Sequence, residues 1–173
     1  DTRNLTSDEK RDPTCLPLPR YWVTSEDVHL STKEAQLQWF VTFRNVARST
    51  DERTAIFGVI PLAGVGNSAP VALLQRDSPQ ENACLHASLA SFAFDYVTRQ
   101  KVGGINFNFF IVAQLPAPTP PMYTKWVQDF VLRRSVELTY TAYDLQPFAR
   151  DLGYDGPPFV WDDERRFIMR CEL

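Results

Sequence analysis

Two stretches in the first half of the chain carry the side-chain pattern of β-strands. Residues 37–43, Leu-Gln-Trp-Phe-Val-Thr-Phe, mix alternation with β-branched and aromatic side chains, and residues 54–60 are similar. The polar segment 45–53 between them has the length of a generous hairpin loop. The pattern therefore predicts an antiparallel pair of strands with arginines near the strand ends. A short apolar run at 71–74 predicts a further strand.

Three later stretches have helical periodicity. Residues 82–99 place an apolar stripe on one face after the start signal Ser78-Pro79, and residues 122–143 carry apolar side chains at spacings of three and four. The stripe of the first helix is formed by Leu85, Leu89, Phe92, Ala93 and Tyr96. A last helix is expected over 162–173, where Asp162, Asp163 and Glu164 are acidic residues typical of a first turn.

The most apolar run of the chain, 106–115, lies between Gly103-Gly104 and Pro116. Such a run predicts a central strand buried on both faces, because an edge strand would expose too much apolar surface. Phe107, Phe109, Ile111 and Ala113 would then lie on one face, and Asn108, Phe110 and Val112 on the other.

These elements predict an α+β fold with a mixed or antiparallel sheet flanked by two or three helices. Residues 1–20 are polar and interrupted by prolines, which predicts an irregular N-terminal segment, and residues 21–173 are expected to form a single domain. The chain begins without Met and stops inside its last helix, so we expect a fragment truncated at both ends.

Charge is distributed unevenly along a chain whose net charge is -3. In residues 99–134 five cations stand against Asp129 alone, which gives +4, whereas both flanks are acidic. The cations are Arg99, Lys101, Lys125, Arg133 and Arg134. They could form a phosphate-contacting face or could be scattered solvated charges. Arg44, Arg48 and Arg53 form a second group, which could contact DNA or pair with Asp51 and Glu52.

No motif in the chain predicts catalysis. The two histidines, His29 and His86, have no Cys or carboxylate at metal-ligand spacing, so no metal site is expected. The turn Gly156-Pro157-Pro158-Phe159 is close to an amine-binding motif, but Gly156 has no side-chain oxygen to accept a hydrogen bond. The sequence alone shows no enzyme in this chain.

Cysteine usage and hydropathy indicate the compartment. Three widely spaced cysteines, Cys15, Cys84 and Cys171, fit no disulfide framework and favour a reducing compartment. No apolar run approaches the roughly 20 residues of a membrane helix. A cytoplasmic protein without a membrane partner is therefore expected.

Several ordered blocks between residues 22 and 173 resemble the region downstream of the catalytic domain in large adenine-specific DNA methyltransferases of Type IIG-like restriction-modification enzymes. The blocks are Leu37–Val46, Asp51–Ile56, Val59–Pro61, Leu89–Val97, Gly103–Phe110 and Gln114–Pro116. The resemblance implies a target-recognition region that binds double-stranded DNA. An upstream catalytic domain of the same chain would bind S-adenosylmethionine, and this fragment would need no cofactor.

The resemblance and the charges together define a candidate DNA-binding set: Arg44, Arg53, Arg99, Lys101, Gly103, Gly104, Lys125, Arg133 and Arg134. The five cations of 99–134 would contact phosphates, and Gly103-Gly104 would permit close approach of the backbone. A turn with positive φ is the alternative role of the two glycines. The alternative function is a structural or protein-interaction domain that packs the methyltransferase against a partner domain. Whether a nuclease is fused to the protein stays open.

Overall fold

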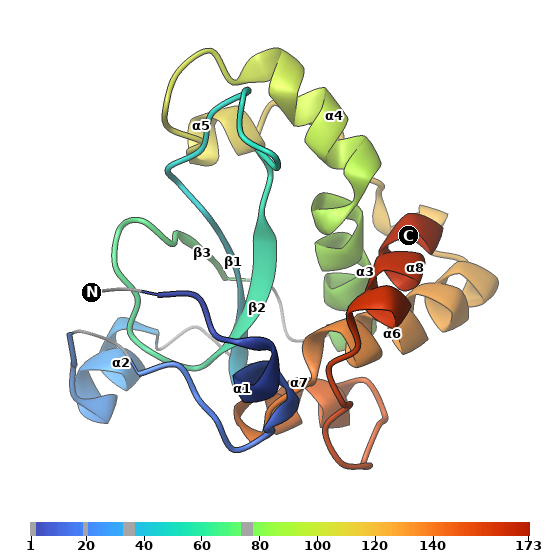
Figure 1. The fold of residues 1–173 in the computed structure, drawn as a ribbon. Coiled ribbons are helices and arrows are strands. Elements are labelled where there is room, and N and C mark those ends of the chain that lie inside the picture. Colours follow the sequence, from blue (N-terminus) through green and yellow to red (C-terminus); the bar gives the residue numbers. More distant parts are fainter. Residues whose placement is uncertain (1–2, 19–20, 33–36, 74–77) are drawn as a thin grey trace.

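The longer helices lie to one side of a small antiparallel sheet (Figure 1). The structure, a computed structural model, describes residues 3–18, 21–32, 37–73 and 78–173. Within these residues the sheet has three strands in the order β2-β1-β3, and eight α-helices complete an α+β fold, as predicted. The strands are β1 (Trp39–Phe43), β2 (Phe57–Pro61) and β3 (Val71–Ala72). The helices are α1 (Ser7–Arg11), α2 (Ser25–Ser31), α3 (Pro79–Ala90), α4 (Phe92–Lys101), α5 (Phe109–Val112), α6 (Lys125–Thr139), α7 (Gln146–Asp151) and α8 (Asp163–Glu172).

The predicted antiparallel pair is confirmed as β1 and β2, in a register that pairs Trp39 with Pro61 and Phe43 with Phe57. As the central strand, β1 is buried on both faces: Trp39, Val41 and Phe43 are at most 2% exposed, and Phe40 is also buried. The short strand β3 pairs with the other edge of β1. Of the run 71–74 expected as a strand, residue 74 lies outside the described residues.

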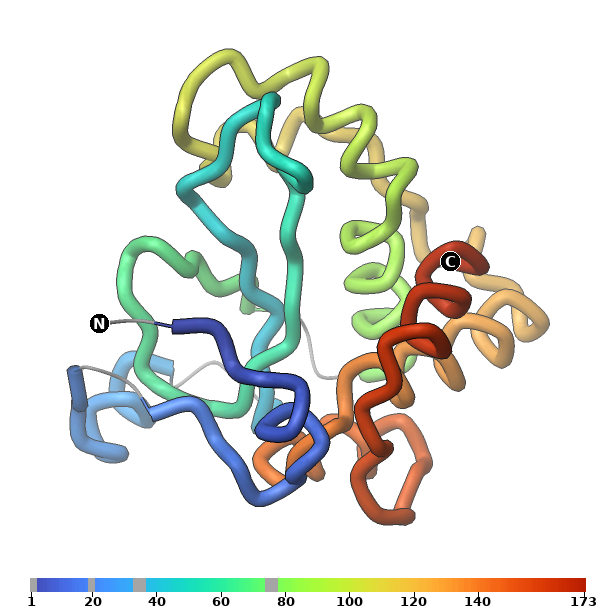
Figure 2. Tube along the Cα trace, in the orientation of Figure 1, coloured from blue at the N-terminus to red at the C-terminus, as the bar shows by residue number. Residues whose placement is uncertain are grey.

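The single helix expected over 82–99 is wrong, because the chain breaks into α3 and α4 at Ser91. Ser91 has an extended backbone, with φ -69° and ψ 158°, and its hydroxyl accepts a hydrogen bond from the Phe94 N–H at 3.1 Å. Serine therefore caps a second helix instead of continuing the first. Figure 2 shows that α4 turns away from α3 at this point.

The long helix expected over 122–143 is shorter in the structure, where α6 spans Lys125–Thr139. Thr124 caps its N-terminus, and a single 3₁₀ turn, Pro120–Met122, precedes it. The final helix is confirmed as α8, and Asp162 caps it by accepting from the Arg165 N–H at 2.7 Å. The N-terminal segment expected to be irregular contains α1, which Thr6 and Glu9 close with a capping box.

The central strand expected over 106–115 is wrong. Only Asn106 forms a β-bridge, with Val46, and Asn108 then caps the short helix α5 by accepting from the Ile111 N–H. Phe107 is fully buried as predicted, but Phe109 and Phe110 are 51% and 77% exposed. The side-chain amide of Asn108 therefore outweighs the strand pattern of its neighbours.

The core is built around aromatic side chains from β1. Phe43 packs against Phe57 and Phe107 with ring centroids 5.3 Å apart in both pairs. At the other end of the strand, Trp39 meets Phe148 edge to face at 5.0 Å. The core therefore joins the sheet to the 102–115 segment at one end and to α7 at the other.

No helix in the described part of the chain is long and apolar enough to cross a membrane. Cys15, Cys84 and Cys171 carry free thiols, and burial raises the pKa of the Cys84 thiol to about 11.

Candidate nucleic-acid interface

The loop between β1 and β2 lies beside the segment that follows α4, and together they form one end of the molecule, at the top in Figure 1. The Ala47 N–H donates to the Ile105 carbonyl at 3.1 Å, and the Phe107 N–H donates to the Asn45 carbonyl at 2.6 Å. We call this surface the hairpin end and define it as residues 44–53 and 99–110. It brings together two segments that lie about fifty residues apart in the sequence.

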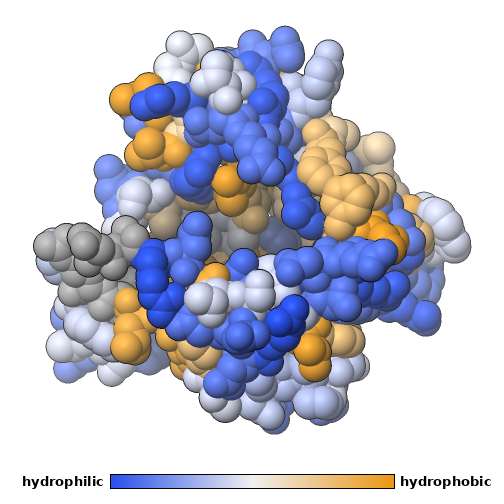
Figure 3. Space-filling view, in the orientation of Figure 1, coloured by the Kyte–Doolittle hydropathy of each residue, from blue (hydrophilic) through white to orange (hydrophobic). Residues whose placement is uncertain are grey.

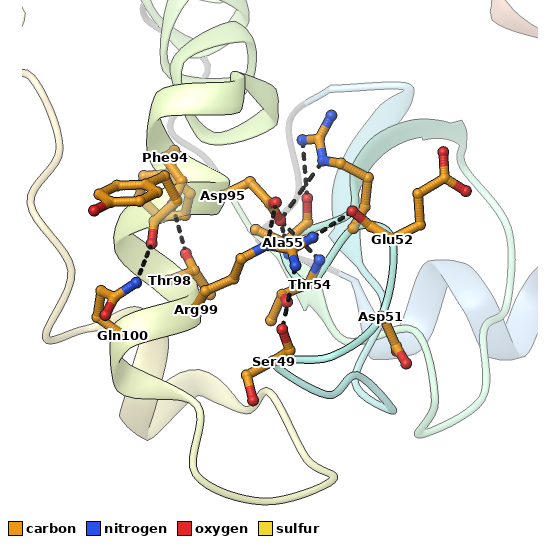
Figure 4. Close-up of polar contacts among 12 residues, drawn as sticks. Ser49, Asp51, Glu52, Thr54, Ala55, Phe94, Asp95, Thr98, Arg99 and Gln100 are labelled. Carbon is orange, nitrogen blue, oxygen red and sulfur yellow. Dashed lines mark hydrogen bonds and ion pairs between the residues drawn. The ribbon is translucent and has the colours of Figure 1, made fainter.

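Asp95 of α4 holds the hairpin end in place (Figure 4). One oxygen of its carboxylate accepts hydrogen bonds from the backbone N–H groups of Thr54 and Ala55, at 2.8 and 2.6 Å. The other oxygen accepts from Nε of Arg99 at 2.9 Å. Asp95 is only 5% exposed, so its charge is stabilised by these partners and hardly at all by water.

The electrostatics of Asp95 agree with this role. Burial alone would raise the pKa of its carboxyl. The Ala55 N–H, the Arg99 guanidinium and the Thr54 N–H together outweigh burial, so the pKa of Asp95 is lowered from its ordinary value. The carboxylate is therefore held in its charged form at neutral pH.

Arg99 and Arg53 complete this network, to which we refer as the Asp95 network. Arg99 also donates to the backbone carbonyls of Ser49, at 3.2 Å, and Glu52. Arg53 donates to the Ala90 carbonyl at 2.9 Å, and its Nε lies 3.6 Å from Asp95. Arg53 and Arg99, two of the candidate DNA-binding residues, thus make hydrogen bonds and ion pairs with other groups of the protein itself.

The remaining candidates of the hairpin end are more exposed. Arg44 pairs with Asp51 at 3.0 Å, as in the second of the two roles considered for the arginines of this loop. Lys101 is exposed and has no hydrogen bond or ion pair with any described residue, and the same is true of the Arg48 side chain. Two cations near Gly103-Gly104 are thus available to a ligand.

Gly103 and Gly104 are exposed, and a Cβ on either would meet no atom within 4 Å. The turn with positive φ that was considered for them is wrong, because Gly153 is the one described glycine with positive φ. The segment is therefore open to close approach from outside the molecule.

The three candidates on α6 lie apart from the hairpin end (Figures 1 and 2). Lys125 pairs with Asp129 at 2.5 Å, and Arg134 pairs with Glu172 at 2.7 Å and covers the ring of Phe130. Arg133 is exposed. The positive segment 99–134 therefore does not form one continuous face: six of the nine candidates gather at the hairpin end, and three lie on α6.

The sequence analysis missed Asp95. A signal was present, because Asp95 and Arg99 are four residues apart in a predicted helix and can therefore pair on one face. Its partners Thr54 and Ala55 lie some forty residues away, and no local pattern identifies them.

Comparisons with models of known protein families, with curated proteins and with solved structures found no match to this chain. In the described part of the chain no three His, Cys, Asp or Glu side chains are grouped so that they could hold a metal ion. The hairpin end combines unpaired cations, open backbone and exposed apolar side chains on one surface.

Proposed function

We propose that this chain is the DNA-binding target-recognition region of an adenine-specific DNA methyltransferase from a restriction-modification system. Its upstream catalytic domain would bind S-adenosylmethionine, and the protein would act in the cytoplasm. The observation that carries the proposal is the hairpin end, where the blocks that resemble this family meet in one folded unit.

The free cations support contact with phosphates. Lys101 and Arg48 are exposed and make no ion pair within the described residues, so binding a phosphate breaks no intramolecular contact. Gly103 and Gly104 leave the backbone beside Lys101 open. We therefore assign the main phosphate contacts to Lys101 and Arg48.

The other arginines of the hairpin end would act differently. Arg53 and Arg99 shape the loop through Asp95, so replacing them would unfold the loop and abolish all contacts together. Arg44 keeps 43% of its side chain exposed while paired with Asp51, and its guanidinium remains the candidate for reading a base edge.

A comparison of two charge-matched double variants tests the proposal. Arg48→Gln/Lys101→Gln and Lys125→Gln/Arg133→Gln each remove two positive charges, the first pair from the hairpin end and the second from α6. Fluorescence anisotropy of a duplex would be followed against salt concentration for the full methyltransferase.

Loss of two phosphate contacts at the hairpin end should flatten the log-log salt dependence of affinity by about two units. The α6 variant should leave the slope close to that of the unchanged protein. Equal flattening in both variants, or none in either, would contradict the assignment of DNA binding to the hairpin end.

One observation favours the alternative of a protein-packing domain. Trp126 at the start of α6 is 73% exposed and stacks on Phe130 with centroids 5.7 Å apart, and Met122 nearby is 61% exposed. Exposed aromatic and Met side chains are typical of protein interfaces. If α6 packs against the catalytic domain, Trp126→Gln should loosen that contact and leave the salt slope for DNA unchanged.

A further inference from the structure

A cavity of about 480 Å³ lies between β2, α3, α6 and α8, and Arg53 and Ala55 of the Asp95 network are among the residues that line it. Figure 3 shows the surface hollowed at the centre of this face. Apolar side chains such as Phe57, Val59 and Leu138 form part of its wall, and Trp161 closes it beside α8. Its volume is in the range of small-molecule sites.

Buried polar groups without partners gather at this cavity. Among the described residues eight side-chain polar atoms are buried and make no hydrogen bond, and five of them belong to four residues that line the cavity. They are Nδ1 and Nε2 of His86, Oγ of Ser135, Nη1 of Arg166 and Nε of Arg53, of which the last still lies 3.6 Å from the Asp95 carboxylate. A buried polar atom without a partner costs about 1–3 kcal/mol, so their concentration in one place needs a physical reason.

His86 and Ser135 show this most clearly, since they are only 8% and 3% exposed. Burial lowers the pKa of His86 to about 4, and the nearby Phe57 backbone opposes this shift without reaching hydrogen-bond geometry. The imidazole is therefore neutral at pH 7, with one N–H to donate. The Ser135 hydroxyl supplies a second neutral donor.

The charge at the cavity is positive. Arg53, Arg166 and Arg170 line it, and no Asp or Glu side chain among the described residues does so. Burial and the Arg170 guanidinium both lower the pKa of Arg166. Within the described residues neither Arg166 nor Arg170 forms an ion pair, although the carboxylates of Asp163 and Glu137, beyond ion-pair distance, act to raise the pKa of Arg166.

Aromatic rings hold these guanidinium groups by their flat faces. Arg166 lies 3.7 Å from the centroid of Trp161, and Arg53 and Arg170 lie 4.8 and 5.2 Å from the centroid of Phe92. Stacking on a ring leaves the in-plane N–H groups free, and these are the donors that bind an oxyanion in pairs.

We propose that this cavity is a binding site for a small phosphomonoester, whose phosphate is held by Arg166, Arg170, His86 and Ser135 and whose remaining part contacts the apolar wall. A phosphate dianion matches the positive charges of Arg166 and Arg170, and its oxygens can accept hydrogen bonds from these two guanidinium groups, from His86 and from Ser135. An internal phosphodiester of a duplex is too encumbered to reach His86 and Ser135, which are buried. The four residues that would hold the phosphate are therefore distinct from Lys101 and Arg48, to which we assign the contacts with DNA.

The test is calorimetric titration at fixed ionic strength with inorganic phosphate and adenosine monophosphate, with adenosine as the uncharged control. We expect saturable binding of adenosine monophosphate with a dissociation constant below about 1 mM, and none of adenosine. Arg166→Gln should weaken binding by at least about tenfold, because it removes a charged donor. Arg11→Gln, an exposed arginine of α1, is the matched control and should bind as the unchanged protein does.

Ser135→Ala is a second variant, which keeps the test valid if Arg166→Gln does not fold. It removes a buried oxygen that has no partner, so the melting temperature without ligand should be unchanged or higher while phosphate binding weakens severalfold. The proposal is overturned if neither phosphate nor adenosine monophosphate binds saturably up to about 10 mM. It is equally overturned if Arg166→Gln and Ser135→Ala bind normally, if adenosine binds as well as its phosphate, or if a duplex without terminal phosphates displaces the nucleotide.

Discussion

The Asp95 network and the α8 side of the cavity both place arginines next to buried polar groups, yet they differ in how those groups are satisfied. At Asp95 both carboxylate oxygens and the carbonyls of Ser49 and Glu52 have donors. At the cavity, donors of Arg166, His86 and Ser135 have no acceptor. Arg53 belongs to both regions, with Nη2 bonded to backbone carbonyls and Nε making no hydrogen bond but lying 3.6 Å from Asp95.

This difference in hydrogen bonding distinguishes arginines that stabilise the fold from arginines whose free N–H groups are proposed to bind a ligand. A satisfied buried charge is expensive to disturb, because removal of one partner leaves the other uncompensated. An unsatisfied buried donor costs stability in the folded protein, and proteins keep such groups mainly at functional sites. The two regions should therefore respond in opposite ways to the same kind of substitution.

The largest effect is expected from Asp95→Asn. The variant keeps the shape of the side chain but leaves Arg99 and Arg53 without a counter-charge in a buried site, so the free energy of unfolding should fall by about 3–5 kcal/mol. Urea unfolding monitored by tryptophan fluorescence measures the loss. Asp129→Asn is the control, since its exposed pair with Lys125 should contribute no more than about 0.5 kcal/mol.

The contribution of Asp95 to the free energy of unfolding should also depend on pH. Its folded pKa is lowered, so its contribution is present above the pKa of the unfolded chain and is lost as the pH falls through the folded pKa. The stability of the protein and of Asp95→Asn should therefore converge in acid. A difference that is the same at every pH would mean that Asp95 acts through shape and not through charge.

A smaller effect, which also lowers stability as the pH falls, is expected at the cavity. Because the pKa of His86 is lowered to about 4, the unfolded chain takes up a proton below pH 6.5 that the folded protein does not. Stability should therefore fall with decreasing pH between about 6.5 and 4, by at most about 1.4 kcal/mol per pH unit. Imidazole NMR signals measure this directly, and His29→Gln assigns them because the chain has only two histidines.

Added phosphate should change the pKa of His86 if it binds in the cavity. An anion beside the imidazole favours its charged form, so adding phosphate should raise the pKa of His86. A His86 signal that titrates near pH 6.5 with or without phosphate would show that the imidazole is neither buried as described nor next to a bound anion.

Local patterns predicted the elements whose determinants are adjacent in sequence. Alternation and β-branched content identify β1 and β2, and the acidic first turn identifies α8. The prediction of a strand over 106–115 was wrong because an apolar run of this kind suits either a strand or a short helix. The cap at Asn108 favours the helix. The break at Ser91 was missed for the same reason, since one hydroxyl decides it.

The candidate site was predictable only in part. Gly103-Gly104 and the arginines of the hairpin loop were identified from composition, and the structure brings them together. Which arginines are paired within the protein depends on Asp95 and on backbone groups some forty to fifty residues away. A local sequence pattern does not contain this information. The cavity joins residues from positions 53 to 173, so its unpartnered donors become visible only once the chain is folded.

The most direct test of the contrast between the two regions is paired urea unfolding of Arg99→Gln and Arg166→Gln without phosphate. Arg99→Gln should lose about 2 kcal/mol or more, because Asp95 and two carbonyls lose their donor. Arg166→Gln should stay within about 0.5–1 kcal/mol of the unchanged protein, since it gives up stacking on Trp161 and weak attraction to Asp163 and Glu137, and relieves repulsion from Arg170. Equal losses in the two variants, or a larger loss for Arg166→Gln, would contradict the account.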